Sequence, residues 1–335
     1  MTTRLPDPPD TLDTDTFAEG GAGFMATKML CVGAELGVFE KLGGGPLTLD
    51  QLTQATGLPH HSLEVLVNGL AALGHLSVRD GRYENSPEAQ AFLAGRTSVD
   101  MRAGLRLYDQ LIYPMWMQLE KVIRSGEPAR PGQSSEQFAR IFTEGVEAWT
   151  RPGAIALAKQ YDFDRHQRLL DIGGGTGSYL IPILERHAGL RCTLFELSAT
   201  IDQAEKRLGK EPTRERVVLV EGDALFDPLP AGHDAVLMAG FVHLFDPERI
   251  VRLLERTREV VAPGARLLIV DQWMDSTHTQ PAFGALLAGT YLILSGNSRT
   301  YSVEEAQRWL GVSGWSFLEH RPLARATSVV IAEAR

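Results

Sequence analysis

The sequence predicts an α/β protein in which a mainly helical N-terminal part precedes a doubly wound, mostly parallel sheet of seven strands with an antiparallel last strand. Three observations support this prediction. Apolar residues recur at helical spacing from about residue 16 to residue 153. From about residue 161, short runs that are apolar on both faces alternate with helix patterns, as in parallel strands covered by helices. The last two strand candidates, residues 317–323 and 327–333, are joined by a loop too short for a crossover helix, so they must pair antiparallel.

The composition is that of an ordinary globular protein. The chain has 335 residues, of which 44% are hydrophobic and 22% charged, and its net charge of −9 provides no general attraction to nucleic acid or to an anionic membrane. No apolar run approaches the roughly 20 residues that a membrane-spanning helix needs. Cys31 and Cys192 are too few for a disulfide framework or a zinc cluster, which favours a reducing, cytoplasmic location. We expect residues 1–15, rich in Pro, Thr and Asp, to form a flexible tail.

Residues 16–98 have the pattern of a winged-helix domain. We expect a helix over residues 24–42, a short helix that begins with a capping box at Thr48 and Gln51 and ends at Gly57, a helix over residues 61–73, and a hairpin with an Asp-Gly turn over residues 76–83. Winged helices often bind DNA, but residues 16–95 contain four basic and eight acidic residues, and the would-be recognition helix has no Lys or Arg. The charge balance favours a packing or dimerisation module over a DNA-binding regulator.

Residues 99–153 are predicted to form a helical connector rich in aromatic side chains. We expect most of these side chains to pack in a core or an interface, and a minority to line a cavity for a flat organic substrate. The candidates for the walls of this cavity, together with several from the C-terminal part, are Tyr108, Trp116, Phe142, Met238, Phe241, Phe283 and Tyr291. Ordinary core packing is the alternative for each of them.

Residues 154–335 alternate between strand and helix patterns. Before the final pair, strands are expected over residues 168–172, 192–196, 217–221, 235–238 and 266–271, and a helix over residues 248–261. A glycine-rich loop, residues 171–177, directly follows the first of these strands, where α/β sheets bind nucleotides. A dinucleotide site would read G-x-G-x-x-G/A, but Ser178 stands at the third position, and Asp171 would repel a pyrophosphate. Both features disfavour an NAD-dependent reductase.

Three carboxylates at consecutive strand ends indicate a different cofactor. Asp171 suits a ligand with a cationic centre and an ammonium group, Glu196 is placed to accept hydrogen bonds from ribose hydroxyls, and Asp223 can accept from the exocyclic amine of an adenine. The loop beside them lets a ligand approach the main chain at its glycines, Gly173, Gly175 and Gly177. This combination predicts a site for S-adenosylmethionine (SAM).

The same residues carry a resemblance to a known family. The loop over residues 171–177, Glu196, Gly222-Asp223 and Pro263-Gly264 resemble the class I SAM-dependent methyltransferases, which have a Rossmann-like catalytic domain. With the winged helix, the connector and Val242-His243, the chain resembles the small-molecule O-methyltransferases of the plant caffeate type and the bacterial natural-product type. The resemblance implies a homodimer whose partner subunit helps to close the pocket, cofactor contacts that include Gly222 and Ala224, a small aromatic or natural-product acceptor, and S-adenosylhomocysteine as the product.

His243 is the candidate general base. Methyl transfer to a hydroxyl is helped by removal of its proton, and a histidine near the cofactor suits that task. In the resembling family, a histidine at this place removes the proton and acidic residues orient it; Asp271 has the position of one such acid, whereas Ser298 replaces the other. The Asp-Trp pair that usually follows the histidine is also absent. A histidine that only packs, or that caps the helix after Asp246, is the alternative.

These departures leave a second enzymatic hypothesis open. It keeps the fold and SAM but changes the acceptor atom to nitrogen or carbon, or removes methyl transfer altogether. The sequence has no His-x-His or His-x-x-x-His pattern and no carboxylate cluster with ligand spacing, so we expect a metal-independent enzyme.

Overall fold

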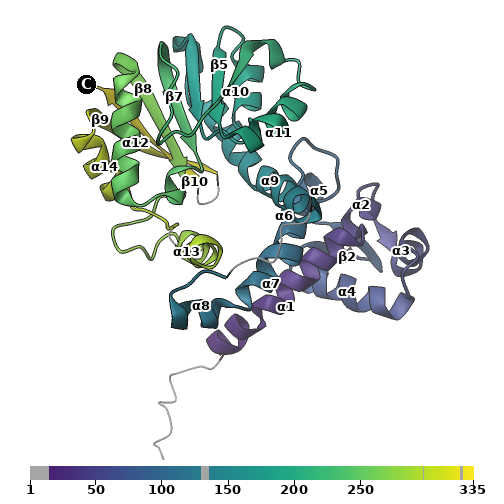
Figure 1. Ribbon diagram of the computed structural model, residues 1–335. Coiled ribbons are helices and arrows are strands. Elements are labelled where there is room, and N and C mark those ends of the chain that lie inside the picture. The colour runs from purple at the N-terminus through teal and green to yellow at the C-terminus, as the bar shows by residue number, and fades with distance from the viewer. Residues whose placement is uncertain (1–14, 130–135, 297, 325–326) are drawn as a thin grey trace, which may run out of the picture. The chain divides into compact units, whose positions relative to one another are not determined.

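The computed structural model describes residues 15–129, 136–296, 298–324 and 327–335 (Figure 1). The chain divides into two compact units. The N-terminal unit comprises Met1–Leu111 and Ile141–Ala148, and the C-terminal unit comprises Ile112–Arg140 and Trp149–Arg335. The expected flexible tail over residues 1–15 lies, except for its last residue, outside the described residues. Across the described residues, no helix is both long and apolar enough to cross a membrane.

The N-terminal unit is mainly helical, as predicted, but its first helix differs from the prediction. Its elements are α1 (Asp15–Glu35), α2 (Val38–Leu42), β1 (Leu47–Thr48), α3 (Leu49–Thr56), α4 (His60–Ala72), β2 (Leu76–Arg79), β3 (Arg82–Asn85), α5 (Pro87–Phe92) and α6 (Arg102–Leu107). The single helix expected over residues 24–42 is two helices, because Gly37 adopts a left-handed conformation with φ of 74°. The apolar periodicity continues across this break, which is why the sequence pattern did not reveal it.

Two local predictions for this unit are confirmed. Thr48 and Gln51 form a reciprocal capping box at the start of α3. The Asp80-Gly81 turn has positive φ at both residues, 50° and 69°, as a two-residue hairpin of the right twist requires. Strand β1 adds to this hairpin, so that the sheet has the order β1-β3-β2.

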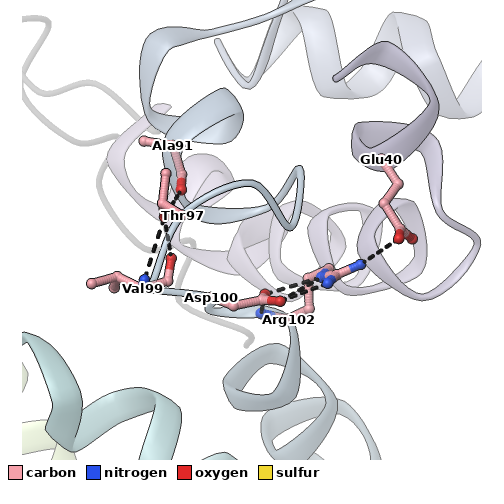
Figure 2. Close-up of polar contacts among 6 residues, drawn as sticks. All are labelled: Glu40, Ala91, Thr97, Val99, Asp100 and Arg102. Carbon is pink, nitrogen blue, oxygen red and sulfur yellow. Dashed lines mark hydrogen bonds and ion pairs between the residues drawn. The ribbon is translucent and has the colours of Figure 1, made fainter. Parts of the chain in front are cut away.

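The segment after α5 is held by side chains (Figure 2). The Thr97 hydroxyl donates to the carbonyl oxygen of Ala91 at 2.6 Å and accepts from the backbone N–H of Val99 at 3.3 Å. Arg102, at the start of α6, pairs with Asp100 at 2.6 Å and with Glu40 of α2 at 2.9 Å. These contacts join α6 to α2 within the N-terminal unit.

The C-terminal unit contains the predicted seven-stranded sheet. Its strands are β4 (Arg168–Ile172), β5 (Arg191–Glu196), β6 (Val217–Glu221), β7 (His233–Ala239), β8 (Val261–Asp271), β9 (Trp315–Ala324) and β10 (Thr327–Ala334). Their order is β6-β5-β4-β7-β8-β10-β9. All neighbouring pairs from β6 to β8 are parallel, and β10 is antiparallel to both β8 and β9. The predicted antiparallel closure is therefore confirmed.

Helices cover both faces of this sheet. The elements that precede and separate the strands are a π-helical turn (Tyr108–Ile112), α7 (Tyr113–Trp116), α8 (Leu119–Ser125), α9 (Glu136–Gln160), α10 (Leu180–Arg186), α11 (Ser198–Leu208), α12 (Pro247–Glu259), α13 (Ala282–Ser295) and α14 (Val303–Val312). Leu169 lies in an apolar cluster with α9, α10 and α11, and the next residue, Leu170, in a second cluster with α12 and α14. Successive strand residues thus enter cores on opposite faces, as expected of a sheet that is buried on both sides.

Candidate active site

The glycine-rich loop after β4 depends on its glycines. Gly173, Gly175 and Gly177 have φ of 69°, 58° and 83°, in the left-handed region. A Cβ atom at Gly173 would lie 2.2 Å from the ring of Phe241, so that ring packs directly on the loop. The sequence pattern therefore reflects both backbone conformation and close packing.

Asp171, the last residue but one of β4, is completely buried. Neither carboxylate oxygen has a hydrogen-bond partner among the described residues, and a Cβ atom at Gly174 would lie 2.3 Å from Oδ2. Burial, with a further contribution from the charge of Glu196, raises the pKa of Asp171 to about 8. A buried, unpaired carboxyl group is costly unless a partner satisfies it, so this group fits a cationic ligand.

The other two predicted carboxylates follow the neighbouring strands β5 and β6. Glu196 accepts hydrogen bonds from the backbone N–H of Gly175 at 3.0 Å and of Leu197 at 2.8 Å, which ties the end of β5 to the glycine loop. Asp223 accepts from the backbone N–H of Leu225 at 2.8 Å. Because β6, β5 and β4 are adjacent and parallel, the three carboxylates lie at one edge of the sheet.

The backbone beside Asp223 is tightly packed. A Cβ atom at Gly222 would lie 2.4 Å from the ring of Phe195, so only glycine fits at this position without a shift. Ala224 is buried, and its carbonyl oxygen accepts from Nε of Arg256 in α12 at 3.1 Å.

His243 and Asp271 form a hydrogen-bonded pair. His243 lies in a single helical turn (Val242–Leu244) after β7, and Asp271 ends the adjacent strand β8. Nδ1 of His243 lies 3.0 Å from Oδ2 and 3.2 Å from Oδ1 of Asp271, and the two side chains are only 13% and 5% exposed. An ionised carboxylate only accepts hydrogen bonds, so in the neutral imidazole this contact selects the tautomer with its N–H at Nδ1 and its lone pair on Nε2.

The alternative in which His243 caps the next helix does not describe the structure. Asp246 is the N-cap of α12, and its side chain accepts from the backbone N–H of Arg249 at 2.9 Å. Ser298, which replaces the second acid of the family, is buried, and its backbone N–H donates to the hydroxyl of Ser295 at 3.0 Å. Asp271 is the carboxylate that is hydrogen-bonded to the imidazole.

The candidate pocket residues lie in different surroundings. Tyr291 of α13 stacks on the imidazole of His243, Phe283 of the same helix is 36% exposed, and Met238 is completely buried in the core of the sheet. Trp116 donates from Nε1 to the hydroxyl of Thr290 at 3.0 Å. The remaining candidates are Phe241, which packs on the glycine loop, and two residues of the N-terminal unit, Tyr108 and Phe142.

Two residues near the His243–Asp271 pair, Gln272 and Tyr179, were not predicted from the sequence. The hydroxyl of Tyr291 donates to Oε1 of Gln272 at 3.2 Å, and Gln272 also donates from its backbone N–H to Oδ1 of Asp271 at 2.9 Å. Tyr179 is buried, and burial together with the charges of Asp271 and Asp171 raises its pKa. The sequence signals were weak: Gln272 merely follows Asp271, and Tyr179 merely follows the glycine loop.

Comparison with known proteins identifies the family. Residues 127–316 match the O-methyltransferase domain, and residues 21–95 match the O-methyltransferase dimerisation domain. The chain is 28% identical over 316 residues to the 3-hydroxy-5-methyl-1-naphthoate 3-O-methyltransferase of Streptomyces sahachiroi, covering 92% of this chain and 91% of the relative. It is also 26% identical over 299 residues to the N,N-dimethyltransferase OxyT of Streptomyces rimosus, with 86% of each chain covered.

The fold agrees with this assignment. The crystal structure of the S-adenosylmethionine-dependent methyltransferase SibL in its apo form superimposes with a TM-score of 0.84 at 28% identity, covering 96% of this chain and 99% of that one. The O-methyltransferase domain match alone spans more than half of the sequence. The chain belongs to the O-methyltransferase family, with a dimerisation domain followed by the catalytic domain.

Proposed function

We propose that this enzyme transfers the methyl group of SAM to a hydroxyl of a small aromatic natural-product intermediate, with His243 as the general base. The observation that carries the proposal is the buried His243–Asp271 pair at the ends of β7 and β8. Beside it is strand β4, near whose end the buried carboxyl group of Asp171 has no hydrogen-bond partner among the residues that the structure describes. The proposed acceptor class is supported by the naphthoate named for the Streptomyces sahachiroi relative.

The residues of the loop and strand ends fit SAM. The buried carboxyl group of Asp171 matches the positive charge of the ligand, and Glu196 and Asp223 provide acceptors for ribose hydroxyls and for the adenine amine. Gly222 and Ala224 bring main chain close to the same ligand. When bound, SAM supplies a methyl group on a positively charged sulfur and leaves as S-adenosylhomocysteine.

The protein contributes proton transfer and orientation. Asp271 accepts a hydrogen bond from the N–H at Nδ1, which holds His243 in the tautomer with a free lone pair on Nε2. Nε2 accepts the hydroxyl proton of the acceptor as its oxygen attacks, and Asp271 stabilises the imidazolium that forms. The aromatic candidates Trp116, Phe241 and Phe283 hold a flat acceptor away from water, and both substrates must be aligned at near-contact distance.

The N-terminal unit serves dimerisation in this proposal. The family match over residues 21–95 supports a homodimer. Helix α1 exposes large apolar side chains, Phe17 at 82%, Phe24 at 50% and Met25 at 57%, that a second copy would cover. In this proposal, helices α3 and α4 and the β2–β3 hairpin form a winged helix that packs against a second copy and does not bind DNA.

Substitution of the base tests the proposal. We expect His243→Gln to lower kcat for a phenolic acceptor by about 100-fold or more, with the Kd for SAM unchanged in calorimetry. His61→Gln, at an 89% exposed histidine of the N-terminal unit, is the matched control and should leave both values unchanged. A loss of less than about threefold in His243→Gln would contradict the role of His243 as the base.

A second candidate function is methylation of an amine. Two observations favour it: Ser298 stands where the family has an acid, and the chain resembles an N,N-dimethyltransferase. A neutral amine attacks through its own lone pair and needs no base. An enzyme that methylates aromatic amines in preference to phenols, with His243→Gln as active as the wild type, would favour this function.

A further inference from the structure

Tyr291 lies face to face with the imidazole of His243. The two ring centroids are 4.4 Å apart, and the ring planes differ by only 4°. Asp271 holds the same imidazole from its edge, through Nδ1 at 3.0 Å. His243 is therefore held from two directions, by a hydrogen bond at its edge and by an aromatic ring on its face.

One residue connects these two contacts. Gln272 donates from its backbone N–H to Oδ1 of Asp271 at 2.9 Å, and Oε1 of its side chain accepts from the hydroxyl of Tyr291 at 3.2 Å. Its amide Nε2 donates to the hydroxyl of Thr327 in β10 at 3.4 Å. The orientations of Asp271 and Tyr291 thus depend on a shared neighbour, which is itself attached to the sheet.

Helix α13 is fixed at the residues just before Tyr291. Nε1 of Trp116 donates to the hydroxyl of Thr290 at 3.0 Å, and Thr290 is buried. The Trp116 ring packs on Gly289, where a Cβ atom would lie 3.0 Å from Cη2. Trp116 and helix α13 belong to the C-terminal unit, as does His243.

We infer that Tyr291 is a positioning residue, which fixes the imidazole plane of His243 by stacking and holds Nε2 in the direction of the acceptor. The inference rests on the proposed role of His243 as the base. A hydrogen bond at Nδ1 alone lets the ring rock about that contact, whereas a parallel ring at van der Waals distance restricts this motion. The electron-rich face of the tyrosine also favours the imidazolium that forms during proton transfer.

A measurement on the resting enzyme tests the stacking without any turnover. The probe is the Cε1–H resonance of His243 in protein labelled at the histidine Cε1 position, assigned among the nine histidines by its loss in His243→Gln. The tyrosine ring current shields this proton, so we expect Tyr291→Leu to move the signal downfield. Tyr291→Phe keeps an aromatic ring and loses only the hydrogen bond to Gln272, so it should move the signal much less. A signal that is the same in Tyr291→Leu and in the wild type would overturn the inference. Tyr291→Met replaces Tyr291→Leu if the latter does not fold.

Activity separates positioning from simple contact with the acceptor. We expect Tyr291→Leu to lower kcat about 3- to 10-fold for weakly acidic phenols, and to leave it unchanged for strongly acidic phenols that are already ionised. Tyr291→Phe keeps the ring and loses only the hydrogen bond to Gln272, so its loss should be smaller than that of Tyr291→Leu. Leu286→Ala, at a 62% exposed position of the same helix, is the control and should change nothing. An equal loss with both kinds of phenol would overturn the inference.

The same assay distinguishes failure of the inference from failure of the proposed function. If His243→Gln loses activity toward weakly acidic phenols and Tyr291→Leu does not, His243 remains the base and the inference is wrong. If His243→Gln itself retains activity, the proposed function is wrong, and the resonance of His243 still reports whether Tyr291 stacks on it.

Discussion

Binding of SAM should depend on pH because of the buried carboxyl group of Asp171. Its pKa is raised to about 8, first by burial and then by the charge of Glu196, so about nine-tenths of the free enzyme carries a proton on Asp171 at pH 7. A cationic ligand binds the ionised form, and the proton must leave when it binds. Through this group the affinity for SAM should therefore rise about ninefold from pH 6 to 7 and about fivefold from pH 7 to 8, and be about 50-fold weaker at pH 6 than at pH 8.

Calorimetry of wild-type enzyme and Asp171→Asn measures this effect. At pH 7 in two buffers of different ionisation enthalpy, the wild type should release about 0.9 proton more per SAM bound than the variant does. Asp171→Asn should bind SAM about 10- to 100-fold more weakly above pH 8, since a charge-assisted contact is lost. The amino group of SAM titrates in both experiments, so the difference between the two proteins isolates Asp171.

Glu221→Gln provides the matched control. Glu221 also ends a strand, β6, but its side chain is exposed, and the substitution changes the net charge by the same amount. Its affinity and proton release should follow the wild type. Equal pH dependence in wild-type enzyme and Asp171→Asn would refute the reasoning, because the carboxyl group would then not titrate on binding.

Two further predictions concern stability. Gly222→Ala places a Cβ atom 2.4 Å from the ring of Phe195 and should destabilise the fold by about 1–3 kcal/mol, measured by urea unfolding; an unchanged midpoint would show that the ring moves away freely. Burial lowers the pKa of His166 and His233, so the fold holds them neutral while the unfolded chain takes up protons below about pH 6.5. Their contribution to stability is complete above that pH and is lost as the pH falls. The raised pKa of Asp171 acts in the opposite direction, because its protonation stabilises the fold as the pH falls, and Asp171→Asn removes this effect. In this variant Tm should fall between pH 6.5 and 5, and a rising Tm would contradict the role given to His166 and His233.

The strands and turns were predicted from local sequence because their determinants are local. The expected strands over residues 168–172 and 217–221 have the bounds of β4 and β6, and the capping box at Thr48 and the Asp80-Gly81 turn are present as expected. Each depends on residues within a few positions of one another. The first helix was predicted incorrectly because its apolar periodicity continues through Gly37, where the backbone is left-handed.

The arrangement of the three strand-end carboxylates could also be predicted from the sequence. Parallel strands joined by helices place their carboxyl ends at one edge of a sheet, so Asp171, Glu196 and Asp223 had to lie together once the alternation was recognised. The glycine loop beside them follows from backbone conformation, which residue type largely dictates.

Other features of the site were decided only by the tertiary structure. The sequence did not reveal that both oxygens of Asp171 are buried with no partner in the described part of the chain. Nor did it reveal that Tyr291 stacks on His243, or that Gln272 joins Tyr291 to Asp271. These contacts join side chains from different elements, and their distances depend on how the helices pack on the sheet. Residue type and spacing determine which groups reach the sheet edge, whereas packing determines which of them touch.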